Sequence, residues 1–279
     1  MKFIDLEKQY KLLKDEIDSN IHNVLNHGRY IMGPEILTLE ENLSKFVGVK
    51  NTVSCASGTD ALLMALMALD VKRDDYVITT PFTYIATAEA ISLLGAIPKF
   101  IDIDSKTFNI DMQKLEHELN QNPGKYRFVM PVNIFGAPVD YDYLYKLKEK
   151  HNFTIIEDAA QSLGASFNGQ VSGGLGDVGC TSFYPAKPLG CYGDGGAIFI
   201  NDDDLADKLR SIREHGAGED KYNNVRLGIN GRMDTIQAAI LLPKLKVFQS
   251  ELEKRNLVAM KYKDKLDRKF QTQLVLDGC

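Results

Sequence analysis

A lysine at position 187 lies in residues 181–190, among apolar side chains and small loop-forming residues. Partial burial in such surroundings lowers the pKa of a lysine amine and favours Schiff-base formation with a carbonyl compound. Pro185 and Pro188 restrict the backbone on both sides of Lys187. Glycines that permit tight turns follow at positions 193, 195 and 196. A lone surface lysine is the alternative interpretation.

Two acidic residues, Glu157 and Asp158, follow the apolar pair Ile155-Ile156. Carboxylates at the end of a buried strand are costly unless a cation meets them. A protonated pyridine nitrogen of a cofactor would be such a cation, and an ion pair within the protein is an equally good explanation. Gln161 follows three residues later, which predicts the same face of a helix one turn on.

Two further segments carry groups that suit a flat, anionic cofactor. Ser57, Gly58 and Thr59 lie between a predicted strand and a predicted helix, where backbone N–H groups and the helix dipole favour an anion. An ordinary helix cap is the alternative for this segment. Tyr84 follows another predicted strand and could stack on a planar ring, or it could pack in the core.

The elements that position these residues alternate along the chain. The pattern predicts strands at 52–55, 76–80, 98–103, 128–132, 154–156, 180–183 and 197–200. It predicts helices at 7–25, from Pro34, at 61–69, from Pro81 to Leu94, at 141–150 and at 233–266. Such alternation is typical of an α/β fold with a mostly parallel central sheet. Ligands bind at the carboxyl ends of strands in such sheets, so we expect the four segments above to meet there.

Composition excludes several other classes of function. The 279 residues carry a formal net charge of −5, without the basic footprint of a nucleic-acid-binding protein. Basic residues gather between Lys244 and Lys269, but acidic residues are mixed with them, which favours a solvated helix face. No helix-turn-helix with a basic recognition helix is present.

The cysteines and histidines show no metal-binding spacing. Cys55, Cys180, Cys191 and Cys279 form no CxxC pair, and the five histidines are scattered, so we expect no metal site. Reduced thiols are expected, in a cytoplasmic protein. The N-terminus becomes charged too early for a signal peptide, and the longest apolar run, 61–69, is too short to span a bilayer.

The order of these features is more specific than any one of them. A glycine loop, an aromatic residue, a strand-end aspartate with Gln161, and a serine five residues before Lys187 occur in sequence. Together they resemble the pyridoxal-phosphate (PLP) dependent aspartate-aminotransferase fold, known as fold type I. More narrowly, residues 57–62, 157–162, 182–187 and 230–239 resemble the DegT/DnrJ/EryC1/StrS family of sugar aminotransferases.

The resemblance implies roles around the ring of PLP. Lys187 would be the catalytic lysine, which forms the Schiff base and moves a proton between the substrate carbon and the cofactor. Asp158 would pair with the pyridine nitrogen, Gln161 would bind the phenolic oxygen, and Tyr84 would stack on the ring.

The resemblance also implies a shared phosphate site and a homodimer. Gly58, Thr59 and Ser182 would hold the phosphate, and Asn230 of the neighbouring subunit would complete it. Arg232 could bind anionic groups of the substrate, although an ion pair at the dimer interface is equally compatible.

The lysine at position 187 distinguishes between reactions within the family. Relatives with histidine there are dehydratases, whereas lysine implies ping-pong transamination, usually with glutamate as the amino donor. The run 184–196 resembles enzymes that aminate C3 of a UDP-linked 2-acetamido-3-keto-glucuronic acid for bacterial O-antigen synthesis. The expected partners are therefore a nucleotide sugar, glutamate and a second copy of the chain, with no nucleic acid and no membrane.

The resemblance divides the chain in two. Residues 1–240 would form the large PLP-binding domain, and 241–279 would begin a C-terminal small domain that is incomplete, because family chains continue further. The alternative function that follows is a catalytically weak, PLP-binding or regulatory remnant of the family.

Overall fold

The computed structural model describes residues 4–220, 222–267 and 269–279. Its centre is a seven-stranded sheet with the strand order β1-β9-β8-β5-β4-β2-β3. Strand β9 runs antiparallel to both of its neighbours, and the other paired strands are parallel. The strands are β1 (Asn51–Cys55), β2 (Tyr76–Thr79), β3 (Ile97–Phe100), β4 (Phe128–Val129), β5 (Thr154–Asp158), β8 (Val178–Ser182) and β9 (Gly196–Ile200). A small hairpin, β6 (Ser166–Phe167) with β7 (Gln170–Val171), lies outside it.

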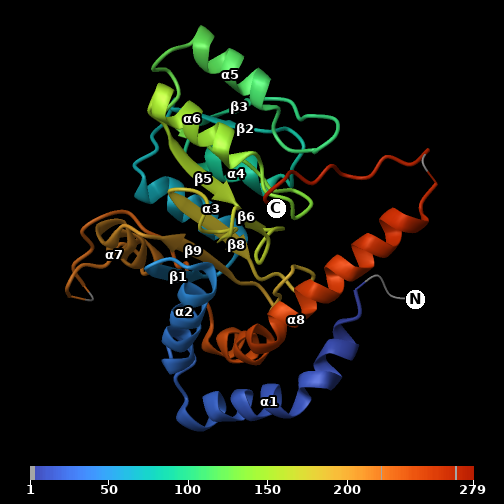
Figure 1. Cartoon of the computed structure of the whole chain (residues 1–279). Coiled ribbons are helices and arrows are strands. Elements are labelled where there is room, and N and C mark those ends of the chain that lie inside the picture. Colours follow the sequence, from blue (N-terminus) through green and yellow to red (C-terminus); the bar gives the residue numbers. More distant parts are fainter. Residues whose placement is uncertain (1–3, 221, 268) are drawn as a thin grey trace.

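Helices cover both faces of this sheet, so the fold has three layers (Figure 1). One face carries α3 (Gly58–Ala68), α4 (Ala86–Leu93) and α7 (Asp203–Arg213). The other face carries α5 (Met112–Gln121) and α6 (Tyr141–His151) over one half, and α2 (Pro34–Val47) with α8 (Thr235–Lys265) over the other. Helix α1 (Leu6–His27) packs along α8 at the bottom of the view in Figure 1. The predicted fold class, an α/β fold of the fold type I kind with a mostly parallel sheet, is confirmed.

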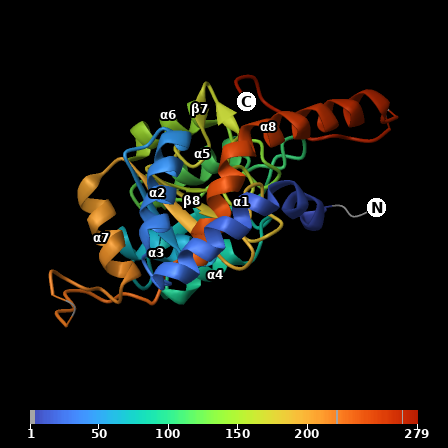
Figure 2. The same cartoon turned by 90° about the horizontal axis from the view of Figure 1, so that it is seen from below.

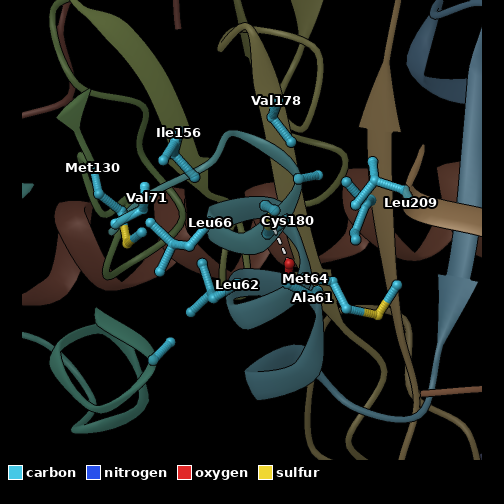
Figure 3. Packing of buried hydrophobic residues seen from close by; sticks show 14 of the residues in the cluster. Ala61, Leu62, Met64, Leu66, Val71, Met130, Ile156, Val178, Cys180 and Leu209 are labelled. Carbon is cyan, nitrogen blue, oxygen red and sulfur yellow. Dashed lines mark hydrogen bonds between the residues drawn. The ribbon is translucent and has the colours of Figure 1, made fainter. Parts of the chain in front are cut away.

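Helix α3 is the part of the core that matters most for the site. Its side chains Leu62, Met64 and Leu66 are buried against the strands, beside Ile156 and Val178 (Figure 3). The Cys180 thiol donates to the carbonyl of Ala61 at 3.4 Å and ties the first turn of α3 to β8. Burial of this apolar face fixes the helix on the sheet, and its N-terminus therefore points at the carboxyl ends of the strands.

Several predicted elements agree with the structure, and others need correction. The helix predicted from Pro81 to Leu94 begins only at Ala86, and residues 81–85 form a non-helical connection. Helices α5 and α7 were not predicted, although each has an aspartate N-cap, Asp111 and Asp202, that marks its start.

The long C-terminal helix has two different halves. Its first half is buried in the apolar cluster with α2, whereas Leu257, Met260 and Tyr262 in the second half are exposed. Seen from below, that second half extends away from the body of the molecule (Figure 2). The prediction of a solvated face from Lys244 onward is wrong for Lys244 itself, which is 1% exposed. The division into a large domain and the start of a small one stays a prediction.

Candidate active site

Strand register brings three predicted segments to one edge of the sheet. Gly196 at the start of β9 pairs with Cys55 of β1 on one side and with Ser182 of β8 on the other. On the far side of β8, Cys180 pairs with Asp158 of β5. The segment that begins at Ser57, the hydroxyl of Ser182 and the carboxylate of Asp158 therefore leave the sheet at the same edge.

Glycines allow the close approach of these segments. A Cβ at Gly58 would lie 2.6 Å from the Cβ of Ser182, and a Cβ at Gly196 would overlap the backbone oxygen of Ser57. Neither position has a positive φ, so glycine is needed here because a side chain would not fit, and not for its backbone freedom. Gly193 and Gly195 have no positive φ either, and a Cβ at these positions would meet the side chains of Gln237 and Met233; their role in tight turns stays a prediction.

The N-terminus of α3 lies at the centre of this edge. Ser57 caps the helix, and its Oγ accepts a hydrogen bond from the backbone N–H of Asp60 at 3.0 Å. The helix-cap interpretation is thus correct for Ser57, yet it leaves Gly58 and Thr59 in the first turn, with Gly58 beside Ser182. The first N–H groups of a helix and its dipole attract anions. The arrangement can hold a phosphate group.

Asp158 is 5% exposed at the end of β5. Its Oδ2 accepts from the Thr87 hydroxyl at 2.8 Å, and its Oδ1 accepts from the backbone N–H of Ala160 at 3.2 Å. Burial raises the pKa of Asp158, while these two hydrogen bonds and the nearby charge of Lys187 oppose the rise. A buried carboxylate with this pairing can receive a further hydrogen bond from a cation.

Lys187 lies in the connection from β8 to β9, and its backbone N–H donates to the carbonyl of Tyr184 at 2.8 Å. The residue is partly buried. Burial lowers the pKa of the Lys187 amine, and the charge of Asp158 partly counters the effect. These surroundings differ from those of a surface lysine, and they favour an amine that is available as a nucleophile or base.

Glu157 points to the opposite side of the strand and has a structural role. Its carboxylate accepts from the Ser172 hydroxyl at 2.6 Å and from the Asn133 amide at 3.0 Å. The backbone N–H groups of Gly173 and Leu175 donate to it as well, at 2.9 and 3.0 Å. An ion pair was the alternative interpretation of the acidic pair, but Glu157 is held by neutral donors that attach residues 172–175 to β5.

Tyr84 and Gln161 are both exposed. Tyr84 is 73% exposed, so the core-packing interpretation of this residue is wrong. Gln161 lies in a turn that follows β5, and the prediction that it lies on a helix is also wrong. In this turn the backbone N–H of Ser162 donates to the carbonyl of Ala159. Both side chains follow strands that end at the same edge of the sheet and remain available to a ligand.

Asn230 and Arg232 form a pair of their own. The Asn230 side-chain oxygen accepts from Arg232 Nη2 at 2.6 Å and from Nε at 3.0 Å. Between them, the Gly231 carbonyl accepts from the backbone N–H of Ala56 at 2.9 Å, which ties this segment to the end of β1. The predicted roles of both side chains in a dimer stay predictions.

Thr87 and Lys244 were missed by the sequence analysis. Thr87 is the polar member of the buried face of α4, beside Ala86, Ala90 and Ile91, and that break in an apolar face was the available signal. Lys244 follows Pro243 within an apolar stretch of α8, which was a weaker signal. Among the described residues, no group of three or more His, Cys, Asp or Glu side chains could hold a metal ion. The described helices include none that is long and apolar enough to cross a membrane.

Two curated relatives match nearly the whole chain. A Pseudomonas aeruginosa protein named UDP-2-acetamido-2-deoxy-3-oxo-D-glucuronate aminotransferase is 50% identical over 94% of this chain and 72% of its own length. An Acidithiobacillus ferrooxidans protein named UDP-N-acetyl-3-dehydro-alpha-D-glucosamine 3-aminotransferase is 40% identical over 85% of this chain and 63% of its own.

Solved structures give the same grouping. A DegT/DnrJ/EryC1/StrS aminotransferase from Brucella abortus superposes with a TM-score of 0.91 at 44% identity, covering 95% of this chain and 72% of that one. NtdA from Bacillus subtilis, solved with bound cofactor PMP, superposes with a TM-score of 0.87 at 28% identity, covering 95% and 60%. The model of the DegT/DnrJ/EryC1/StrS aminotransferase family matches residues 11–276. The chain therefore belongs to this family and is a PLP-dependent aminotransferase.

Proposed function

We propose that this protein transfers an amino group from glutamate to C3 of a UDP-linked 2-acetamido-3-keto-hexuronic acid, a step in bacterial O-antigen synthesis. The observation that carries the proposal is the 50% identity, over 94% of this chain, with the P. aeruginosa 3-oxo-glucuronate aminotransferase. The A. ferrooxidans relative is also named for a UDP-linked 3-keto sugar, which supports C3 as the aminated carbon.

The residues at the strand edge fit PLP. Because Gly58 lies against Ser182, a phosphate bound here would face the first N–H groups of α3 and the hydroxyl of Ser182. Buried Asp158 accepts from Thr87 and Ala160, and its carboxylate suits a protonated pyridine nitrogen. Lys187 is the partly buried amine of this edge, and its charge interacts with that of Asp158. The phosphate would be held by Gly58, Thr59 and Ser182. The pyridine nitrogen would pair with Asp158, and the phenolic oxygen would bind Gln161. The ring face would stack on Tyr84.

PLP, when bound, supplies an aldehyde that a lysine can hold covalently and a ring that accepts electrons. Asp158 would hold a proton on the ring nitrogen, since its carboxylate already has protein donors on both oxygens. The Nζ of Lys187 would move a proton between the substrate carbon and the cofactor, because burial keeps more of this amine neutral than an ordinary lysine. Lysine at this position supports transamination, whereas dehydration is expected with histidine.

The first experiment follows the visible absorbance of the PLP-loaded protein before and after addition of glutamate, with Lys187→Ala as the control. We expect a visible band in the wild type that glutamate abolishes and that Lys187→Ala lacks. A band that forms in the wild type but does not respond to glutamate would support the alternative, a PLP-binding regulatory protein.

The second experiment compares keto-sugar acceptors. We expect kcat/KM for the UDP-linked 3-keto-glucuronic acid to exceed that for the neutral 3-keto-glucosamine analogue by about tenfold or more. Arg232 is the proposed partner of the substrate carboxylate, so Arg232→Gln should raise KM for the acid by a larger factor than KM for the neutral sugar. Equal losses with both acceptors would contradict the role of Arg232.

We also propose that the active site is shared between two subunits, with Asn230 completing the phosphate site of its neighbour. Lys187→Ala and Asn230→Ala proteins should each be weakly active alone. If the two side chains come from different chains, equal mixing after subunit exchange restores about one quarter of the sites, because one site of each mixed dimer carries no substitution. No recovery in verified mixed dimers would place both residues in one chain's site.

A further inference from the structure

A second lysine lies close to the Lys187 loop. Lys244 of α8 is 1% exposed, its Nζ donates to the carbonyl of Gly190 at 2.6 Å, and the same atom lies 4.1 Å from the centre of the Tyr192 ring. A buried ammonium group is expensive unless it is paired with acceptors or an aromatic face. Both of its partners here belong to the residues that follow Lys187.

Gly190 packs against the part of the loop that precedes Lys187. A Cβ at Gly190 would lie 2.8 Å from the backbone carbon of Pro185 and 2.8 Å from the oxygen of Tyr184. The backbone N–H of Lys187 in turn donates to the Tyr184 oxygen at 2.8 Å. The carbonyl that Lys244 holds therefore belongs to a residue packed directly on the turn that contains Lys187.

The ends of the loop are closed on each other. The backbone N–H of Cys191 donates to the carbonyl of Phe183 at 2.8 Å, and its thiol donates to the same oxygen at 3.0 Å. Gln237, also on α8, accepts from the backbone N–H of Tyr192 at 2.9 Å. Because the loop is closed at its base, a shift of Gly190 is passed to Lys187 rather than absorbed by the flanking strands.

We propose that Lys244 is a positioning residue for Lys187: from α8 its ammonium group holds the Gly190 carbonyl and keeps the Lys187 turn packed against the strand edge. The inference rests on the catalytic role proposed above for Lys187. Lys244 is itself too buried to reach a substrate, so its effect is exerted through the loop. Without this contact, water gains access to Lys187, and the pKa of its amine moves back toward the ordinary value because the burial that lowers it is lost.

The test uses Lys244→Met, which keeps the length of the side chain and removes the donor. Lys246→Met is the matched control, because Lys246 is an exposed lysine on the same helix that pairs with Glu16 at 2.7 Å. Ile17→Ala is the control for general destabilisation, since Ile17 is a fully buried residue of α1, outside the loop. The pH dependence of Lys187 acetylation is measured by mass spectrometry in cofactor-free protein, and the PLP dissociation constant is measured separately.

We expect Lys244→Met to raise the apparent pKa of Lys187 and to weaken PLP binding by about tenfold to a hundredfold, the scale of a misplaced catalytic group. Lys246→Met and Ile17→Ala should leave both quantities at wild-type values. If Lys244→Met does not fold, Lys244→Gln, a shorter and uncharged donor, should shift both quantities in the same direction. A folded Lys244 variant with the same Lys187 pKa and the same PLP dissociation constant as Ile17→Ala would overturn the inference. Failure of wild-type protein to bind PLP through Lys187 would instead overturn the proposed function.

Discussion

The hydroxyl of Thr87 donates a 2.8 Å hydrogen bond to Oδ2 of Asp158, and this contact joins α4 to the end of β5 at the edge of the sheet that carries the candidate site. Thr83 Oγ1 lies 2.8 Å from Thr87 Oγ1. Because Thr87 gives its only hydroxyl proton to Asp158, Thr83 is the donor to Thr87. Two threonines four residues apart, one in the connection before α4 and one in its first turn, thus form a short chain of hydrogen bonds that ends on the carboxylate proposed to pair with the cofactor ring.

Replacing Thr87 by valine should raise the pKa of Asp158 further. Burial already raises this pKa, and the Thr87 hydrogen bond is the largest of the effects that oppose the rise. Carbon-13 NMR titration of the Asp158 carboxyl group in cofactor-free protein measures the shift. Leaving the buried acceptor without its donor should also lower the free energy of unfolding by about 1–3 kcal/mol. Thr87→Ser keeps the hydroxyl and serves as the control; an equal pKa in the valine and serine variants would contradict the prediction.

The Arg213–Glu40 ion pair should be a strong determinant of stability. Arg213 Nη1 lies 2.7 Å from Glu40 Oε1 and also donates to the Ser54 carbonyl at 3.0 Å, and both charged side chains are at least 90% buried. Arg213→Met leaves the buried Glu40 charge without a cation, with only the Ser54 donors, and should cost about 3–5 kcal/mol in unfolding free energy by urea denaturation. The double variant with Glu40→Leu should recover most of that loss. If the double variant is as unstable as Arg213→Met, the loss of stability comes from lost packing of the Arg213 side chain and not from the unpaired charge.

Gly58→Ala should weaken both the fold and the binding of the cofactor phosphate. The new methyl group would lie 2.6 Å from the Cβ of Ser182, so the two segments must separate. Overpacking of this kind costs about 1–3 kcal/mol. Gly124→Ala is the comparison, because position 124 has open space and a φ of +73°, so only backbone strain arises there. Calorimetry should show that both variants lose stability, while only Gly58→Ala increases the PLP dissociation constant.

Lys244 should make stability depend on pH in the alkaline range. Burial lowers the pKa of Lys244 to about 8, while Cys191 in the loop and Glu251 on α8 act to raise it. Tyr192 and, behind it, Tyr10 of α1 are the aromatic groups on this side. Because the unfolded chain binds this proton up to pH 10.5 and the folded chain releases it from about pH 8, the contribution of Lys244 to stability rises across that interval. Wild type should therefore gain stability relative to Lys244→Met between these values in urea titrations, and parallel curves would contradict the assignment.

The sequence by itself determined the fold class, and its motifs predicted candidate residues for the site. The alternation of strands and helices predicted the parallel sheet, and the order of Gly58, Asp158 and Lys187 along the chain was enough to indicate the family. Such features are local: a glycine before a helix or an acid after an apolar strand is visible within a few residues. For the same reason the local pattern could not tell which of the two acids, Glu157 or Asp158, faces the site, because both follow the same apolar strand.

Tertiary structure alone decided which partners these residues meet. Side chains alternate across a strand, so Asp158 faces the site while Glu157 is held by Ser172 and the backbone of Gly173. The contacts of Thr87 with Asp158 and of Lys244 with Gly190 join residues 71 and 54 positions apart. Lys244 belongs to a run that looks solvated by composition, but packing of the first half of α8 buries it. Pairing of this kind depends on the assembled layers, so a local pattern could mark Thr87 as an unusual polar residue but could not identify Asp158 as its partner.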